Sequence, residues 1–390
     1  MTPMRDLMFP VERLTPAGAH CFFGYYDNPA WDAAGQRHLC HHVPFWGRLP
    51  TGNDTATLGI IRLADRAFIP LCETNAWNFQ QGTMLQWHPL EPNESVIFNR
   101  FVGGRYVGVV RRVATGEELL LSQPVASVDP AGRHALSINF SRNFDFRPGY
   151  GYANKPDDWK DTPAPKEDGI FLIHLATGES ELIVSYDDLA RCFTSEARGR
   201  KLVVNHIAFN TDGTRFVALL RTFPDAAHKQ WATALITADW RGRDRYLLRN
   251  FGIESHYHWR DPGHLLIWSD AGGAASLYLL TDRTQEAETV DPAFFARDGH
   301  CSYSPDRRWL LYDSYPIDNY RYLYAYNLEE RRAHTLGGFY SAPAAIVDIR
   351  CDLHPRWNRA GTAVSFDSTH ESYRAIYQMD VSSLVTDGRR

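Results

Sequence analysis

A short motif recurs along the chain and limits the folds open to it. In its clearest copy, residues 299–314, the aromatic Tyr303 is followed by the turn SPDR and then by an apolar run. Apolar and aromatic runs bounded by Gly, Pro, Asp and Asn are typical of strands joined by tight turns. Copies spaced by roughly 40 to 55 residues, with one longer gap, are typical of a β-propeller. The residues at the anchor position of the motif are Trp31, Trp87, Val128, Phe209, Trp259, Tyr303 and Trp357.

The two ends of the chain are expected to close the ring. Residues 4–15 precede the first anchor and look like a lone strand, whereas the last blade lacks a strand after residues 376–381. The N-terminal strand is therefore expected to complete the last blade, which would remove an exposed sheet edge. The repeat thus predicts an all-β fold, a single seven-bladed β-propeller domain over residues 1–390.

The longer gap between anchors contains an irregular segment, residues 143–166. It holds four prolines, two glycines and many aromatic residues, without a period. A connection of this length inside a compact domain is usually functional or disordered, and its aromatic content argues against disorder. We expect a loop insertion folded over one face of the propeller, with Tyr150, Tyr152 and Trp159 available to stack on a ligand. The alternative is an insertion without a functional role.

Four successive copies carry a histidine three residues before the anchor. Since the innermost strand of a blade lines the central channel, equivalent positions on adjacent blades can point to one volume. Imidazoles from several strands suit a divalent metal ion, and Zn, Mn, Ni and Fe all remain possible. Cys301, Asp348 and Asp352 are near enough in sequence to add a ligand; duplication of a structural histidine is the alternative. The predicted metal ligands are His206, His256, His300 and His354.

Composition excludes several partners. The 41 basic and 46 acidic residues give a net charge of −5, so neither nucleic acid nor an anionic membrane is an expected partner. No run of about 18 apolar residues is present, and no membrane span is expected. The six cysteines are scattered and no signal peptide is visible, which favours a reducing compartment, the cytoplasm. The oligomeric state is not indicated.

Several phrases of the repeat resemble a known group of enzymes. The phrases FFGYYDNPAW, GTMLQWHP, NHIAFNTDG, SHYHWRD, DGHCSYSPD and RCDLHPRW are similar to those of propeller polysaccharide lyases of the ulvan lyase and oligogalacturonate lyase type, with TolB-like repeats. The similarity lies in repeat shape and histidine placement, and it covers nearly the whole chain. The resemblance implies a seven-bladed propeller, a bound divalent metal, and β-elimination of a uronate-containing glycan.

Such a lyase requires specific side chains. The proton removed is α to a carboxylate, so the developing charge must be neutralised and a base must be within reach. The candidate bases are His256 and His258, which lie two residues apart and so on one face of a strand. Tyr26 is a possible acid or base. Arg221 could hold the substrate carboxylate, and Arg142 occupies a comparable place in the third blade, although either arginine could instead be a solvated strand end.

Two other classes of function stay open. One is a propeller that binds a glycan or a protein without catalysis, which would not need a histidine cluster. The other is a metal-dependent enzyme of different chemistry, such as a hydrolase. The chain has no GxSxG elbow, P-loop or GxGxxG, so serine hydrolases of that type, nucleoside triphosphatases and Rossmann enzymes lack support. The favoured prediction is a lyase acting on a carbohydrate.

Overall fold

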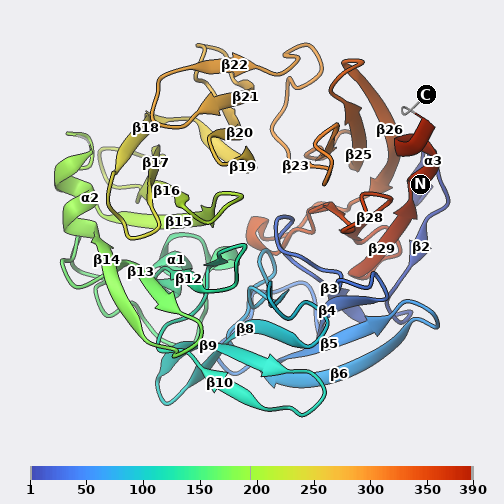
Figure 1. The fold of residues 1–390 in the computed structure, drawn as a ribbon, viewed down its shortest axis with the longest axis horizontal. Helices are drawn as coiled ribbons and strands as arrows, with labels where there is room; N and C mark the ends of the chain where they lie inside the picture. Colours follow the sequence, from blue (N-terminus) through green and yellow to red (C-terminus); the bar gives the residue numbers. More distant parts are fainter. Residues whose placement is uncertain (1, 194, 388–390) are drawn as a thin grey trace.

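Seven antiparallel sheets surround a central axis in this computed structural model, which describes residues 2–193 and 195–387 (Figure 1). The first three blades are β3 (His20–Phe22), β4 (Arg37–Val43), β5 (Ala56–Arg62) and β6 (Ala67–Thr74); β7 (Gln86–Trp87), β8 (Ser95–Val102), β9 (Arg105–Arg112) and β10 (Glu118–Leu120); and β11 (Ser127–Val128), β12 (His134–Ser137), β13 (Gly169–His174) and β14 (Ser180–Ser185). The fourth and fifth are β15 (Leu202–Phe209), β16 (Arg215–Thr222), β17 (Thr233–Asp239) and β18 (Tyr246–Gly252); and β19 (Glu254–Asp261), β20 (His264–Ser269), β21 (Ser276–Thr281) and β22 (Ala287–Thr289). The sixth is β23 (Cys301–Tyr303), β24 (Trp309–Asp313), β25 (Tyr320–Asn327) and β26 (Arg332–Tyr340), and the seventh contains β27 (Arg356–Trp357), β28 (Ala363–Ser368) and β29 (Ala375–Asp380). The prediction of a seven-bladed propeller is confirmed.

The anchors of the sequence motif end the inner strands. Five of them are the last residues of β7, β11, β15, β23 and β27. Trp259 lies two residues before the end of β19, and Trp31 forms an isolated bridge with His38 beyond the end of β3. All seven positions except Val128 and Trp357 are buried. The anchors therefore mark the ends of the inner strands, as the repeat predicts, and most of them also fill the core.

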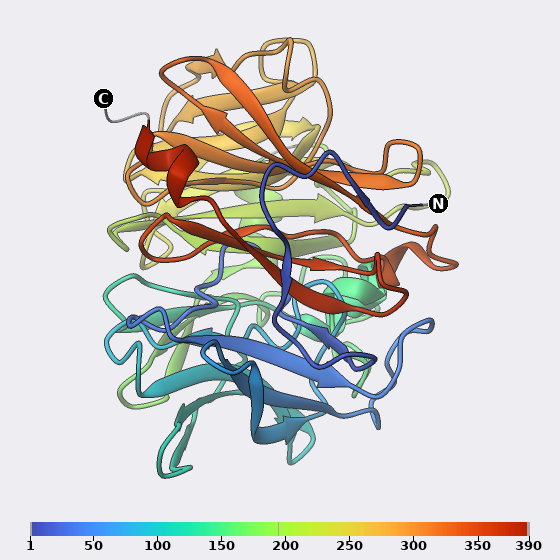
Figure 2. The ribbon, with the colours of Figure 1, turned by 90° about the vertical axis from the view of Figure 1, so that its right-hand side faces the viewer.

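The N-terminal segment closes the ring with two separate strands. β2 (Glu12–Arg13) pairs antiparallel with β29, so the seventh blade gains its fourth strand, and Glu12 lies opposite Gln378. β1 (Met4–Arg5) pairs instead with β26 and forms a fifth strand of the sixth blade. Figure 2 shows this segment running across the outer edges of both sheets. Closure of the last blade by the N-terminus is confirmed, and the segment also covers the edge of the neighbouring blade.

Helices are few and short in the described ranges. They are α1 (Phe140–Phe146), η1 (Pro148–Tyr150), α2 (Tyr186–Cys192), η2 (Val347–Ile349) and α3 (Ser382–Asp387). None of the helices in residues 2–193 and 195–387 is long and apolar enough to cross a bilayer.

The insertion of the third blade is an ordered, partly helical segment held by Arg142. This guanidinium is fully buried, lies 2.9 Å from the carboxylate of Asp157, and donates to the carbonyls of Thr162 and Pro163 at 3.0 and 2.7 Å. Tyr152 is also fully buried and stacks on Phe140 with ring centroids 4.3 Å apart. Arg142 and Tyr152 thus hold the insertion together. Both side chains are buried inside it, whereas the sequence suggested that they were available to a ligand.

Two histidines of the first blade are buried in the neutral form. His38 is bonded through Nδ1 to the carbonyl of Leu39 and through Nε2 to the hydroxyl of Ser365, at 2.6 and 3.0 Å. The nitrogen Nε2 of His41 accepts the backbone N–H of Thr83 at 3.1 Å. Burial lowers the pKa of each imidazole from 6.5 to about 3. As the pH falls, both imidazoles therefore become protonated in the unfolded chain at a higher pH than in the native state.

These histidines predict a loss of stability in mild acid. Between pH 6.5 and about 3 the unfolded chain binds the protons that the native state does not. The free energy of unfolding should therefore fall by about 1.4 kcal/mol per pH unit for each histidine as the pH drops. Urea unfolding at pH 7 and pH 5 measures this slope. His38→Gln should reduce this slope by the contribution of about one proton, or about 1.4 kcal/mol per pH unit. His228→Gln, at an exposed position, should leave the slope unchanged. Equal slopes for the wild type and both variants would contradict the assignment of neutral buried histidines.

Candidate active site

Three histidines from neighbouring blades form a continuous chain near the start of the inner strands. His256 lies on β19, His300 directly precedes β23, and His354 lies two residues before β27. The ring centroids of His256 and His300 are 4.0 Å apart, and those of His300 and His354 are 4.3 Å apart. The shared position in the repeat therefore brings three of the four predicted imidazoles together.

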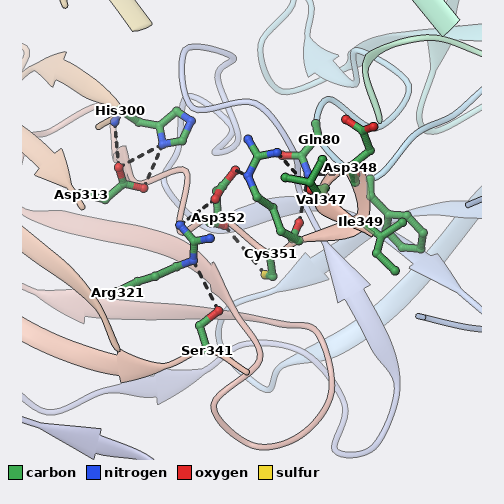
Figure 3. A network of polar contacts seen from close by, with 12 residues as sticks. Gln80, His300, Asp313, Arg321, Ser341, Val347, Asp348, Ile349, Cys351 and Asp352 are labelled. Carbon is green, nitrogen blue, oxygen red and sulfur yellow. Dashed lines mark hydrogen bonds and ion pairs between the residues drawn. The ribbon is translucent and has the colours of Figure 1, made fainter. Parts of the chain in front are cut away.

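Carboxylates orient two of these imidazoles. The Nδ1 atom of His256 lies 2.9 Å from Asp298. Figure 3 shows the second pair, in which Nδ1 of His300 lies 3.0 Å from both oxygens of Asp313. A carboxylate beside Nδ1 holds the proton there and leaves Nε2 as the free lone pair. The carboxylates of Asp298 and Asp313 thus fix the tautomer of each ring.

The geometry near His300 fits a divalent metal ion. Ligand atoms of His300, Asp352 and His354 all lie within 4.8 Å of one another, and the three residues are buried. Nε2 of His300 and both ring nitrogens of His354 have no hydrogen-bond partner among the described residues. Buried polar atoms normally have a partner, and two imidazoles with one carboxylate are a common donor set for divalent transition metals. These three residues could hold the ion.

Asp352 carries a full negative charge in this cluster. One of its oxygens lies 2.7 Å from Arg321 (Figure 3), and the other lies 2.7 Å from Arg350. Although burial opposes it, the two guanidiniums lower the pKa of the Asp352 carboxyl well below its usual value. A carboxylate offers about four lone-pair positions, so two arginines leave room for a further partner.

His206 lies apart from this cluster, so the predicted set of four histidines does not form. The hydroxyl of Tyr25 is 3.0 Å from Nδ1 of His206, and the two rings are stacked at 5.2 Å. Of the additional ligands considered from the sequence, Asp352 joins the cluster. Asp348 faces Arg147 at 3.8 Å, and the thiol of Cys301 lies 3.9 Å from a backbone carbonyl.

A cleft of about 970 Å³ opens beside the histidine chain. It lies at the start of β19, where Glu254 and Ser255 line it together with Asp298, which orients His256. Five basic side chains line the cleft against two acidic ones, although the whole chain is net negative. Such a cleft attracts anions. The basic residues are Arg147, Arg221, Lys229, Arg321 and Arg350.

Arg221 is a buried cation that has no carboxylate within ion-pair distance among the residues that the structure describes. Its guanidinium is bonded to the hydroxyl of Thr233 at 3.2 Å and to the side-chain oxygen of Asn205 at 2.5 Å. A third contact is to the backbone carbonyl of Glu254 at 3.4 Å. Burial, followed by the positive charge of Arg147, lowers the pKa of Arg221 to about 10. Because a buried charge is costly unless it is paired, this site favours an incoming anion.

His256 differs from the two buried imidazoles in its exposure. Its side chain is 10% exposed, compared with 2% for His300. Burial lowers the pKa of His256 despite the neighbouring Asp298. A neutral imidazole with its proton held on Nδ1 can accept a proton at Nε2, which is what a general base requires.

Neither Tyr26 nor His258, the remaining candidates from the sequence, lines the cleft, although the Tyr26 ring lies 5.1 Å from that of His300. The hydroxyl of Tyr26 donates to the carbonyl of Tyr257 at 2.7 Å and accepts its N–H at 3.1 Å, so it braces β19. His258 lines a separate hollow of about 360 Å³ at the other end of β19, among the turns that follow the anchors. Sequence reasoning missed Asp298, Asp313 and Arg147. The sequence contained a signal for the two aspartates only. Asp298 stands two residues before His300, and Asp313 follows the apolar run of the same motif copy.

Comparison with known proteins shows similarity in structure alone. No protein-family model matches the chain, and no match was found among curated sequences. A solved oligogalacturonate lyase in complex with manganese superposes with a TM-score of 0.69 at 14% identity, over 97% of this chain and 96% of its own. An oligogalacturonate lyase from Vibrio parahaemolyticus gives 0.65 at 16% identity, over 97% and 95%. A puromycin-hydrolysing peptidase from Mycobacterium tuberculosis gives 0.52 at 12% identity, over 98% of this chain and 55% of its own. The resemblance in fold predicted from the repeat phrases is confirmed.

Proposed function

We propose that this chain is a metal-binding lyase that cleaves uronate glycosides by β-elimination. The observation that carries the proposal is a buried arginine in the lining of a cationic cleft, with no ion-pair partner among the described residues. Beside it lies a neutral histidine, His256, whose orienting carboxylate Asp298 lines the same cleft. Elimination next to a carboxylate needs those two groups together, one to hold the carboxylate and one to take the α proton. The fold of two oligogalacturonate lyases supports the choice of this reaction class.

Each side chain then has a separate role. Arg221 binds the carboxylate of the uronate and stabilises the negative charge that develops on it. His256 takes the proton from C5 at Nε2, while Asp298 stabilises the resulting imidazolium. The electrons of the C5–H bond form the C4=C5 double bond as the C4–O bond breaks. The leaving oxygen then receives a proton, which imidazolium His256 or the solvent in the open cleft can supply.

The metal is assigned to the neighbouring buried cluster. His300, Asp352 and His354 would hold a divalent ion, such as the manganese found with one of the structural neighbours. When bound, such an ion supplies positive charge that can polarise a nearby oxygen or fix local structure. The residues that bind the uronate and move the proton remain Arg221 and His256.

The proposal is tested with a panel of uronate oligosaccharides. The protein, supplied with manganese, is incubated with oligomers of galacturonate, glucuronate and mannuronate, and ultraviolet absorbance of the C4=C5 product is followed. We expect absorbance to rise with at least one of them, whereas neutral oligosaccharides should give no signal. New reducing ends without ultraviolet absorbance would show a hydrolase. Binding without any cleavage would show a non-catalytic propeller.

A further inference from the structure

An exposed tryptophan stands at the mouth of the cleft. Trp231 belongs to the segment between β16 and β17, lines the cleft, and remains 44% exposed. Its ring packs edge-on against Phe146 of α1, with centroids 5.4 Å apart. A large apolar side chain that is held in place but left open to solvent is typical of a binding surface.

Two guanidiniums flank this ring. The guanidinium carbon of Arg147 lies 5.5 Å from the Trp231 centroid, and that of Arg221 lies 5.9 Å from it. Arg147 also lies over the ring of Tyr150 at 4.4 Å. Arg147 forms a long ion pair with Asp348, whose oxygen is 3.8 Å away and outside hydrogen-bond distance. Among the described residues, Asp348 is the one carboxylate within 4.0 Å of either guanidinium, so two neighbouring cations leave a place for an anion beside an aromatic face.

The same cleft therefore has lining groups for a further sugar beside the uronate that Arg221 would bind. Exposed apolar side chains, among them Ile253 and Val347, line the same cleft together with its charged groups. A pyranose ring presents C–H groups on one face, which pack on an aromatic ring, and a uronate adds a carboxylate at its edge. Trp231 and Arg147 match those two features.

We propose that Trp231 and Arg147 form a second sugar subsite, which binds the uronate adjoining the one held by Arg221. Trp231 packs against the C–H face of this second ring, and Arg147 binds its carboxylate. The inference rests on the proposed function, because that function places the scissile uronate at Arg221. It makes the protein selective for substrates with two neighbouring uronates over those in which a uronate adjoins a neutral sugar.

Calorimetric titration of the full chain tests the subsite. Trigalacturonate, monomeric galacturonate and a neutral trisaccharide are titrated into His256→Gln protein, so that the trimer is not consumed, and into the same protein with each further change. Trp231→Ala and Arg147→Gln should each weaken trimer binding by about tenfold and change monomer binding less than about twofold. Trp231→Phe should retain most of the affinity. Leu120→Ala on β10 and Arg112→Gln at the end of β9, at exposed positions outside the cleft lining, are the matched controls.

The outcomes separate this inference from the proposed lyase activity. Trimer binding that depends on Trp231 and Arg147 supports the subsite even if wild-type protein gives no unsaturated product. Cleavage of the trimer with unchanged affinity in both variants would overturn the subsite and leave the lyase standing. Equal weakening of monomer and trimer would also overturn it, because both changes would then act at the Arg221 position. Absence of both binding and cleavage with every uronate would overturn both proposals.

Discussion

His256→Gln is expected to lower kcat for uronate elimination by about 10²–10⁴-fold, the usual contribution of a general base. Glutamine can keep a hydrogen bond to Asp298, but it has no lone pair of comparable basicity to take the C5 proton. Since the side chain of His256 is only 10% exposed and already neutral, its exchange for another neutral polar group should leave the melting temperature near that of the wild type. Initial rates of ultraviolet absorbance, with thermal unfolding of each protein, measure both effects.

Two further variants sharpen this result. Asp298→Asn keeps the size of the side chain but removes the charge that stabilises imidazolium His256, so it should lower kcat while KM stays close to the wild-type value. His228→Gln changes a histidine with 54% side-chain exposure that lies outside the cleft, and it should leave the rate unchanged. Full activity in His256→Gln would show that another group takes the proton. Loss of activity together with loss of folding would assign His256 a structural role.

The fold could be predicted because its signal is periodic. Each anchor and its turn repeat the same strand end, and seven such copies determine both the blade number and the inner face. The split of the N-terminus into β1 and β2 could not be predicted. A segment that forms one short strand and a segment that forms two have the same apolar pattern. The sheet edge that each strand covers depends on the positions of the edges in space, which local strand propensity does not determine.

The histidine cluster was only partly predictable, for a local reason. Gly24 has φ +110°, and a Cβ there would lie 2.9 Å from the backbone carbon of Gln81. This glycine lies two residues after β3 and precedes Tyr25 and Tyr26, whose rings lie among the histidines at the centre of the ring; the Tyr25 ring stacks on His206. The repeat places all four histidines at one level, but it does not reveal that two tyrosines from the first blade occupy the space between His206 and the others.

The cleft residues outside the histidines were the least predictable. Arg147 follows α1 and Trp231 lies in a connection between strands, so neither occupies a repeat position. Their meeting depends on how the insertion of the third blade packs against the β16–β17 connection, through Phe146 and Trp231. Arg221 was recognisable because it stands at the end of a repeat strand. Substrate-binding groups on loops have no period that a single sequence could show.

His300→Ala and His354→Ala should each abolish retention of a divalent ion. The wild-type chain should retain about one ion after manganese loading and dialysis. Loss of a direct ligand should weaken binding by more than the 10- to 100-fold that removal of an outer partner typically costs. Asp313→Asn, which alters only the carboxylate behind His300, should fall in that smaller range. Metal content by plasma mass spectrometry, with titration of manganese into the apoprotein, measures each affinity independently of activity.

His206→Ala separates the observed cluster from a set of four histidines. Because Nδ1 of His206 is bonded to Tyr25 and its ring is stacked on that tyrosine, its removal should leave metal content unchanged. A loss equal to that of His300→Ala would mean that His206 turns toward the ion when the ion binds. If neither wild-type protein nor any variant retains manganese or zinc, the buried nitrogens of His300 and His354 serve another purpose, and the metal assignment fails. The elimination roles of His256 and Arg221 would then be tested by the rate measurements alone.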